Sequence, residues 1–534
     1  MRYEEIEKRA LSAMRKAGRE HAQEKRETSE RKQQRSTVQR MYASARQSRL
    51  TGDWSTGTSS ADAEIRTSLT ALRGRCRALD RDSAYAKRAR TVVVNNVVGS
   101  GIGMQAQVKS SRSRFIPRVN DAIEQAFKDW WETPEFCHTG ATLAAGDFER
   151  AVMSEVFETG EVFIRQHLTK FGASEIPYSL ELIESERVPH GIQPQVIRAT
   201  GIGVRMGIEV DNFYRPLAYW IRDHHPSDFH YPSGARGAEK VTRVDASEII
   251  HLRIVERWPQ TRGVPWLHAV AKKMNDMDAY SQAEIVAARG AANYMAAIET
   301  DPMSSIGEEQ EDGTRQVEIS PGIIVELAAG EKMNFFSPNR PNTALDGFMR
   351  YMLREVAAGT NVSYESISRD YSQSNYSSSR LGLLDDRDTW RVLQMWFLRS
   401  FRNVMHRKWL QQAIFARAIQ NISVNDFALN VLKFAAVKFK PRGWSWVDPT
   451  KEVAAFKEAE KAGYITKTQI ISQTSSQDFE DVIEERRAEL DEISEKGLKF
   501  DTDSPTEKSE SSAPAKDPDD DDDDDTDDDD DDDP

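Results

Sequence analysis

The sequence predicts an α+β protein that is mainly helical, and three stretches of the chain lead to this prediction. Residues 263–298 form one Ala-rich segment in which Pro265 occupies only the first turn, which is typical of a long helix. Apolar side chains recur every three or four residues from 381 to 420 and indicate a second long helix. Residues 161–256 instead alternate short apolar runs with turn residues, which indicates strands. Because 534 residues are too many for one core, we expect roughly two to four folded units.

The part of the chain before residue 161 is expected to be helical around one short strand. Residues 61–90 carry apolar side chains at helical spacing and predict a helix. The valine-rich run 91–98 predicts a strand that ends in a glycine turn. This turn has the spacing GxGxG rather than GxGxxG, which argues against a dinucleotide site. A helix is expected from Asp121, which forms a capping-box pattern with Glu124, and another over 146–160.

The remaining elements follow from the same patterns. The expected strands are Glu161–Leu168, Tyr178–Ile183, Val204–Val210, Pro216–Ile221 and Glu248–Val255, with a hairpin turn at Asp211-Asn212. Further short strands are expected at 317–319 and 322–327, and helices at 344–358 and within 450–496. Residues 359–380 are rich in Ser, Tyr and Asn with almost no aliphatic side chains, so we expect a polar loop there.

The net charge of −14 resides in the C-terminal tail. From Lys516 to the end there are 15 Asp and one Lys, and −15 + 1 = −14, so the preceding residues sum to zero. A neutral body argues against a protein that simply coats nucleic acid. The tail is interpreted as a solvated, self-repelling segment, with cation binding, mimicry of a nucleic-acid backbone and exclusion of DNA as the alternatives. Residues 1–40 combine 12 Lys or Arg with 7 Asp or Glu and predict a helical arm that orders on a partner.

The motifs of several enzyme classes are absent from the sequence. There is no GxxxxGK[ST] phosphate loop, no GxSxG and no HExxH, and no local arrangement singles out a catalytic triad. The only cysteines, Cys76 and Cys137, are too few for a disulfide framework and predict reduced, buried thiols. The His- and Asp-rich run 223–230 is interpreted as a polar turn, with a metal site as the alternative. The first residues lack a signal-peptide core, and no apolar run approaches the roughly 20 residues of a membrane span.

Six short blocks resemble one family, the portal proteins of lambda-like tailed bacteriophages. The blocks are Val97–Gly103, Pro216–Ile221, Glu256–Pro265, Pro321–Glu331, Val362–Ser372 and Asn375–Arg380. They occur in collinear order between about residues 45 and 420, and this order is more specific than any single block. The resemblance implies the portal fold of wing, stem, clip and crown, assembled into a ring with a central channel for double-stranded DNA.

The resemblance also implies a division of the chain into regions. These are a flexible arm (1–60), the wing (61–262), a stem helix (263–298), the clip (299–342), a second stem helix (343–360), a tunnel loop (361–380), a long helix returning to the wing (381–449), a helical crown (450–496) and an acidic tail (497–534). The implied function is that of a portal vertex subunit, a structural protein rather than an enzyme, without cofactor or metal. The alternative is another phage head protein, either a capsid or scaffold protein or a maturation protease.

The resemblance finally implies partners and a site. The partners would be eleven further copies in a dodecameric ring, the terminase large subunit, head-completion adaptors, and the major capsid and scaffold proteins. The protein would occupy the virion after assembly in the host cytoplasm, with no role for a membrane. The residues expected to face the channel are Arg369, Tyr371, Gln373 and Asn375, with Arg350 and Arg354 nearby. The charges of Arg369 and Asp370 nearly cancel, and such a polar loop offers DNA weak, exchangeable contacts. Salt bridging between subunits is the alternative role for Arg350 and Arg354.

Overall fold

The computed structural model divides the chain into two compact units, Met1–Arg442 and Gly443–Pro534. It describes residues 3–39, 49, 57–110, 115–191, 203–228, 240–293, 296–299, 332–335, 344–373, 375–444, 449–474 and 479–497. The expected strands at 317–319 and 322–327 and the acidic tail lie outside these residues. The second unit contains three helices in its described part, α14 (Pro449–Lys461), α15 (Lys467–Thr474) and α16 (Phe479–Glu495), which agrees with the helices expected over 450–496.

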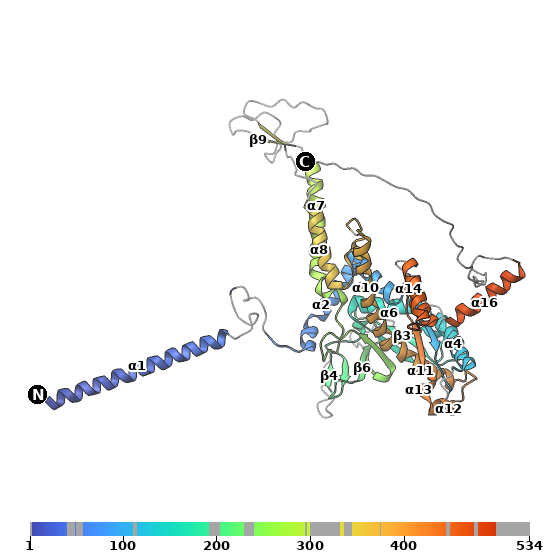
Figure 1. Cartoon of the computed structure of the whole chain (residues 1–534), viewed down its shortest axis with the longest axis horizontal. Coiled ribbons are helices and arrows are strands. Elements are labelled where there is room, and N and C mark those ends of the chain that lie inside the picture. The colour runs from blue at the N-terminus through green and yellow to red at the C-terminus, as the bar shows by residue number, and fades with distance from the viewer. Residues whose placement is uncertain are drawn as a thin grey trace, which may run out of the picture. The chain divides into compact units, whose positions relative to one another are not determined.

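The first unit is mainly helical (Figure 1). Its helices are α1 (Tyr3–Gln39), α2 (Ala61–Asp82), α3 (Ala84–Val97), α4 (Pro117–Trp131), α5 (Pro134–Cys137), α6 (Ala145–Thr159), α7 (Ala271–Asn293), α8 (Leu345–Thr360), α9 (Tyr364–Ser368), α10 (Tyr376–Phe397), α11 (Asn403–Phe415), α12 (Val424–Leu429) and α13 (Val431–Phe434). A π-helical turn at Leu398–Arg402 joins α10 to α11, so the expected long helix is helical from Tyr376 to Phe415.

Two antiparallel sheets form the β-rich part. The strands of the unit are β1 (Gly103–Ala106), β2 (Glu161–His167), β3 (Ser179–Ile183), β4 (Gly203–Arg205), β5 (Ile208–Val210), β6 (Pro216–Arg222), β7 (Val241–Asp245), β8 (Ile249–Arg253), β9 (Ala296–Glu299), β10 (Lys332–Phe335) and β11 (Val437–Lys440). The sheets have the orders β3-β2-β8 and β4-β5-β6-β7. Phe163, Ile208 and Tyr219 belong to a buried apolar cluster that both sheets share. The hairpin expected at Asp211-Asn212 is confirmed, since β5 pairs antiparallel with β6 across it.

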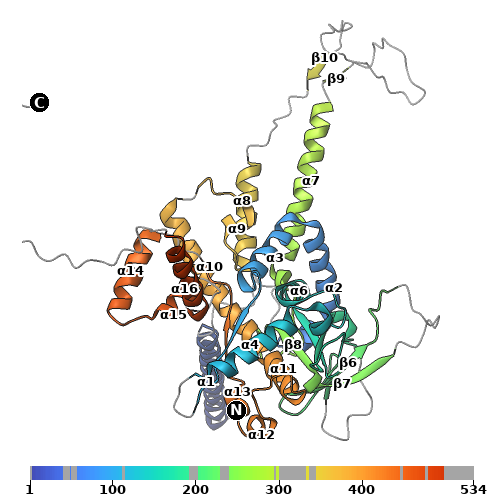
Figure 2. The same cartoon turned by 90° about the vertical axis from the view of Figure 1, so that its right-hand side faces the viewer.

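Two helices far apart in the sequence, α7 and α8, lie side by side in both views (Figures 1 and 2). The Tyr280 and Phe348 rings meet edge to face with their centroids 4.9 Å apart, and Lys273 forms an ion pair with Glu355. Strand β9 follows α7 and pairs antiparallel with β10, which precedes α8. The chain therefore runs out along one helix, turns through a β pairing, and returns along the other.

Several predicted elements differ from the structure. The predicted strand 91–98 is wrong, because this valine-rich run forms the second half of helix α3. Val93 and Val97 are completely buried there, so tertiary packing outweighs the β preference of valine. The capping box is also wrong: α4 begins at Pro117, and Glu124 instead accepts a hydrogen bond from the Ala106 backbone N–H at 2.7 Å.

Other boundaries move for identifiable reasons. The expected helix 263–298 begins only at Ala271, after a 3-10 turn at Trp266–Ala269, and ends at Asn293. The strand expected over 204–210 is a hairpin, because Met206 and Gly207 take left-handed φ angles of 47° and 84°. A Cβ at Gly207 would lie 2.4 Å from the Pro189 carbonyl oxygen, so the turn requires glycine. Strand β7 was not predicted.

Candidate channel-facing segment

The polar segment expected to face a channel follows directly from the end of helix α8. Asn361 ends α8 with a left-handed φ of 53°, which turns the chain away from the helix axis. This end of α8 is held close to the start of α7. Trp266 donates its indole N–H to the Thr360 carbonyl oxygen at 2.9 Å. The segment therefore leaves a rigid pair of helices at a defined point.

The segment is more ordered than the expected loop. Residues 364–368 form the short helix α9, and helix α10 starts at Tyr376, so the predicted loop 361–380 is wrong at both of these places. Ile367 is buried under α9, which explains how a segment poor in aliphatic residues acquires a fixed position. Arg369 ends α9 with a left-handed φ of 61°.

Two hydrogen bonds to other helices fix α9. Arg88 of α3 donates its Nε–H to the Ser366 carbonyl oxygen at 2.8 Å, and the Ser363 hydroxyl donates to the Asp386 carboxylate of α10 at 2.6 Å. Burial raises the pKa of Asp386, while the Ser363 hydrogen bond opposes this rise. Side chains of α3 and α10, which lie outside the segment in the sequence, thus fix its position. The sequence alone did not predict either contact.

The carboxylate of Asp370 organises the turn that follows α9. It accepts hydrogen bonds from the Ser372 hydroxyl at 2.6 Å, the Ser372 backbone N–H at 3.0 Å and the Tyr364 hydroxyl at 3.0 Å. Arg350 Nε of α8 lies 3.7 Å from the same carboxylate. The Ser372 and Tyr364 hydrogen bonds and the Arg350 charge lower the pKa of Asp370. The group is therefore ionised at neutral pH and directed into the turn.

The residues expected to face a channel divide into two groups. Arg369, Tyr371, Gln373 and Asn375 are exposed, and 58% of the Tyr371 surface is accessible. Arg350 is half-buried and forms an ion pair with Asp346 at 3.0 Å. Arg354 is exposed, with its guanidinium 5.8 Å from the centre of the Tyr364 ring. The structure thus brings Arg350 and Arg354 to the base of the turn, where Tyr364 and Asp370 are their neighbours within the same chain.

The exposed surface of the turn is basic. The charges of Arg369 and Asp370 cancel in the net charge of the turn, as expected. The Asp370 carboxylate, however, accepts hydrogen bonds from Tyr364 and Ser372 rather than from Arg369. Burial and, to a lesser extent, the charge of Arg369 lower the pKa of Arg88. The exposed guanidinium of Arg369, flanked by neutral polar side chains, can attract phosphate without enclosing it.

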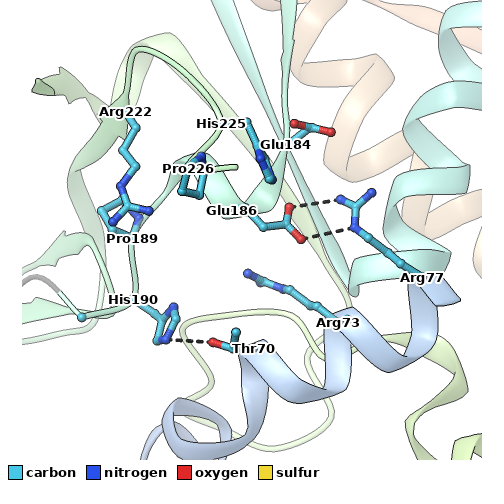
Figure 3. A pocket seen from close by; sticks show the side chains of 12 residues that line it. Thr70, Arg73, Arg77, Glu184, Glu186, Pro189, His190, Arg222, His225 and Pro226 are labelled. Atoms are coloured by element: carbon cyan, nitrogen blue, oxygen red, sulfur yellow. Dashed lines mark hydrogen bonds and ion pairs between the residues drawn. The ribbon is translucent and has the colours of Figure 1, made fainter. Parts of the chain in front are cut away.

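A separate pocket of about 650 Å³ lies between α2 and the β-rich part (Figure 3). Its basic side chains are engaged within the protein: Arg77 bonds to Glu186 at 3.1 Å, and Arg73 bonds to Glu161 at 2.5 Å. The His190 ring lies 3.2 Å from the Thr70 hydroxyl. These contacts join α2 to the β-rich part, so we interpret the pocket as structural.

The described residues contain neither a cluster of metal ligands nor a membrane-spanning helix. Among the described residues, no three His, Cys, Asp or Glu side chains come close enough to hold a metal, and His230 of the candidate run lies outside those residues. In the same part of the chain, no helix combines the length and the apolar character needed to cross a bilayer. Cys76 and Cys137 are free and buried, and burial raises their pKa values to about 11 and about 12.

Comparison with known proteins identifies the family. The family described as "Phage portal protein, lambda family" matches residues 47–394, from before α2 to within α10. The chain belongs to the lambda family of phage portal proteins. The resemblance noted in the sequence and the mainly helical α+β portal fold are thereby confirmed. The protein is a portal subunit, and the alternatives of a capsid, scaffold or protease are not supported.

Individual portal proteins show the same relationship. The chain is 27% identical to a probable portal protein of Halomonas phage phiHAP-1, over 82% of this chain and 83% of that protein. It is 23% identical to the portal protein of Escherichia phage N15 and 21% identical to portal protein B of Escherichia phage lambda, in each case over 68% of this chain and 73% of the relative.

Similar solved structures include the neck of an empty GTA particle and an HK97-family phage portal protein from Corynebacterium diphtheriae. The first has a TM-score of 0.43 at 12% identity and covers 74% of this chain and 92% of its own. The second has a TM-score of 0.28 at 14% identity and covers 58% of this chain and 84% of its own.

Proposed function

We propose that twelve copies of this portal subunit form a ring at one vertex of the phage head, and that double-stranded DNA passes through its centre. The helix pair α7–α8 would form the stem, residues 299–342 the clip, and residues 450–496 the crown. Ring assembly would begin in the host cytoplasm, and the finished ring would stay in the virion. Its partners would be the terminase large subunit, head-completion adaptors, and the major capsid and scaffold proteins.

We further propose that the turn after α9 faces the DNA. The observation that carries this proposal is the Asp370-centred turn, which holds Arg369 and Tyr371 exposed at the end of the α7–α8 pair. Arg369 supplies a single charged contact, and the neutral side chains of Tyr371, Gln373 and Asn375 supply weak ones. DNA that must slide needs contacts of this kind, because each strong phosphate contact adds salt-dependent affinity that opposes movement.

Deleting residues 366–374 tests the proposed position of the segment. The deletion variant should assemble into rings, seen by negative-stain microscopy, but it should package or retain less DNA than wild type. The matched point variant Arg369→Gln keeps the backbone and removes the charge. It should reduce DNA retention most strongly at low salt, because its lost contact is electrostatic. Normal genome filling by both variants would place the segment away from the DNA.

A further inference from the structure

Helix α10 is apolar on two opposite faces, and the described residues of the first unit, Met1–Arg442, cover only one of them. The covered face packs against α3 and contains Trp390 and Phe397, which are buried. Gln394 on this face donates hydrogen bonds to the carbonyl oxygens of Asn96 at 2.8 Å and Arg442 at 3.1 Å. These contacts fix the rotation of α10 about its axis, so the composition of the opposite face is not explained by the fold of the unit.

The opposite face presents Leu381, Leu384, Val392 and Met395, which we call the outer stripe. Their spacing places them in one row along the helix, because 3.6 residues make one turn. Their exposed fractions are 68% for Leu381, 43% for Leu384, 70% for Val392 and 45% for Met395. Together they expose roughly 400 Å² of apolar surface, which is in the range of the largest patch on a typical monomer and often marks an interaction site.

The chemistry of the outer stripe excludes DNA as its occupant. Four aliphatic or thioether side chains offer no partner for phosphate, and Asp388 lies in the same row between Leu384 and Val392. The carboxylate of Asp388 forms an ion pair with Arg391 at 2.7 Å. This ion pair largely neutralises the positive charge of Arg391, which would otherwise attract phosphate. A row of this kind fits the side of another helix or an apolar protein surface.

The position of the outer stripe indicates which protein surface covers it. Leu381 lies six residues after Asn375, the last residue of the segment proposed to face the channel. In a closed ring, neighbouring copies are closest together at the inner radius. A ring also requires each copy to contact its two neighbours through two different surfaces. In the proposed ring, helix α10 would start where a neighbouring copy is nearest, and its outer stripe is exposed in the single chain.

We propose that the outer stripe of α10 packs against the neighbouring copy of the chain and is required for ring closure. This inference rests on the proposed ring. Burying the stripe removes its apolar area from water, and the same contact fixes the start of α10 beside the channel-facing segment. The contact therefore links subunit assembly to the position of Arg369 and Tyr371.

The double variant Leu381→Glu/Val392→Glu tests the proposal, with Leu432→Glu as the matched control. Leu432 of α13 is 78% exposed and lies off the stripe. Light scattering should show rings for wild type and the control, and at least a tenfold lower ring fraction for the double variant. Far-UV circular dichroism should be unchanged in the double variant, because both side chains are exposed in one chain and their replacement should leave the fold intact.

The outcomes separate this inference from the proposed function. Absence of rings in wild type would overturn the ring itself. Wild-type rings that persist in the double variant would overturn only the role of the outer stripe. Loss of rings in the Leu432→Glu control as well would also count against a specific role for the stripe.

Thiol labelling provides a measurement that does not depend on a disruptive variant. Cys76 and Cys137 are completely buried, so the two native thiols should not react with maleimide in the folded protein. In rings of Val392→Cys, maleimide should react at least tenfold more slowly than in the same chain unfolded in urea. A ring rate close to the unfolded rate would overturn the inference. Equal protection in a monomeric Leu381→Glu background would also overturn it, because the cover would then lie within one chain.

Discussion

At the scale of single residues, one buried carboxylate joins several elements of the first unit. Glu161 of β2 contacts Arg262 at 2.6 Å, Arg73 at 2.5 Å, His251 at 2.9 Å and the Gly263 backbone N–H at 2.8 Å. Burial alone would raise the pKa of Glu161, but Arg262, Arg73 and His251 hold it well below its usual value. Burial and Arg253 lower the pKa of His251 to about 3, so this imidazole is neutral and donates its Nε2–H.

Replacing Glu161 by Gln should be strongly destabilising. The variant leaves the guanidinium groups of Arg73 and Arg262 buried without a compensating charge, which typically costs about 3–5 kcal/mol. Urea unfolding of the purified protein should show this as a lower midpoint. Asp82→Asn is the matched control, because Asp82 pairs with Arg81 at an exposed position and its loss should change the midpoint little. Equal effects of the two variants would show that the buried cluster contributes no special stability.

Glu149 should show the opposite dependence on pH from an ordinary paired carboxylate. Burial raises its pKa to about 7 from 4.5, although Arg402 and the Ile102 N–H oppose this rise. The folded state then binds more protons than the unfolded state between these values, so stability falls as the pH rises from 4.5 to 7. The free energy of unfolding, measured by urea titration across this range, should shift in favour of Glu149→Gln relative to wild type by ~1–3 kcal/mol. A constant difference between the two proteins would show that Glu149 ionises normally.

At the scale of elements, the contact between the start of α7 and the end of α8 depends on one glycine. A Cβ at Gly359 of α8 would lie 2.3 Å from Val270 Cγ1, whereas a Cβ at Gly347 of the same helix meets nothing within 4 Å. We therefore expect opposite effects from the same substitution. Gly359→Ala should destabilise by about 1–3 kcal/mol through overpacking, and Gly347→Ala should stabilise by about 0.5–1 kcal/mol through helix propensity. Thermal unfolding measures both.

A second substitution distinguishes overpacking from other causes. Val270→Ala removes the methyl group that the new Cβ would meet, so it should recover part of the stability lost in Gly359→Ala. Additive effects in the double variant would show that the two residues do not interact.

The turn after α9 is expected to depend on Asp370. Asp370→Ala removes the acceptor for Ser372 and Tyr364, so the turn should open and expose the peptide bond after Arg369. Limited trypsin digestion should cleave there at least several-fold faster than in wild type. Gln373→Ala, an exposed position in the same segment, is the control. Unchanged cleavage in Asp370→Ala would show that α9 and its contacts with Arg88 are sufficient to hold the turn.

At the scale of the whole molecule, the acidic tail is expected to be dispensable for assembly. Truncation after Lys516 removes 15 aspartates, all of the same sign. Copies in a ring would repel each other through their tails. The truncated protein should therefore assemble at least as well as wild type, and the difference in assembly should be larger at low salt, where charges are less screened. Sedimentation at two salt concentrations measures this. A truncated protein that stays monomeric would show that the tail takes part in the subunit contact.

Much of this portal subunit follows from local patterns in its sequence. Long helices with periodic apolar residues, such as α10 and α11, and strands bounded by turn residues, such as β2 and β6, depend on interactions between near neighbours in the chain. The family blocks likewise lie in continuous segments. The candidate segment 361–380 could be found by its composition, although α9 could not, because its anchors come from Arg88 and Asp386.

The features that could not be read from the sequence depend on contacts between distant residues. Thr91–Val97 is helical because α3 is enclosed by other helices, and the local preference of these residues does not reflect this packing. Asp370 was expected to offset Arg369, but its orientation toward Tyr364 and Ser372 leaves Arg369 on the surface. The outer stripe of α10 differs from the opposite face of the helix only because α10 packs against α3 on the side that contains the buried Trp390 and Phe397. Periodicity measures how apolar a helix is, whereas packing determines which of its faces remains available.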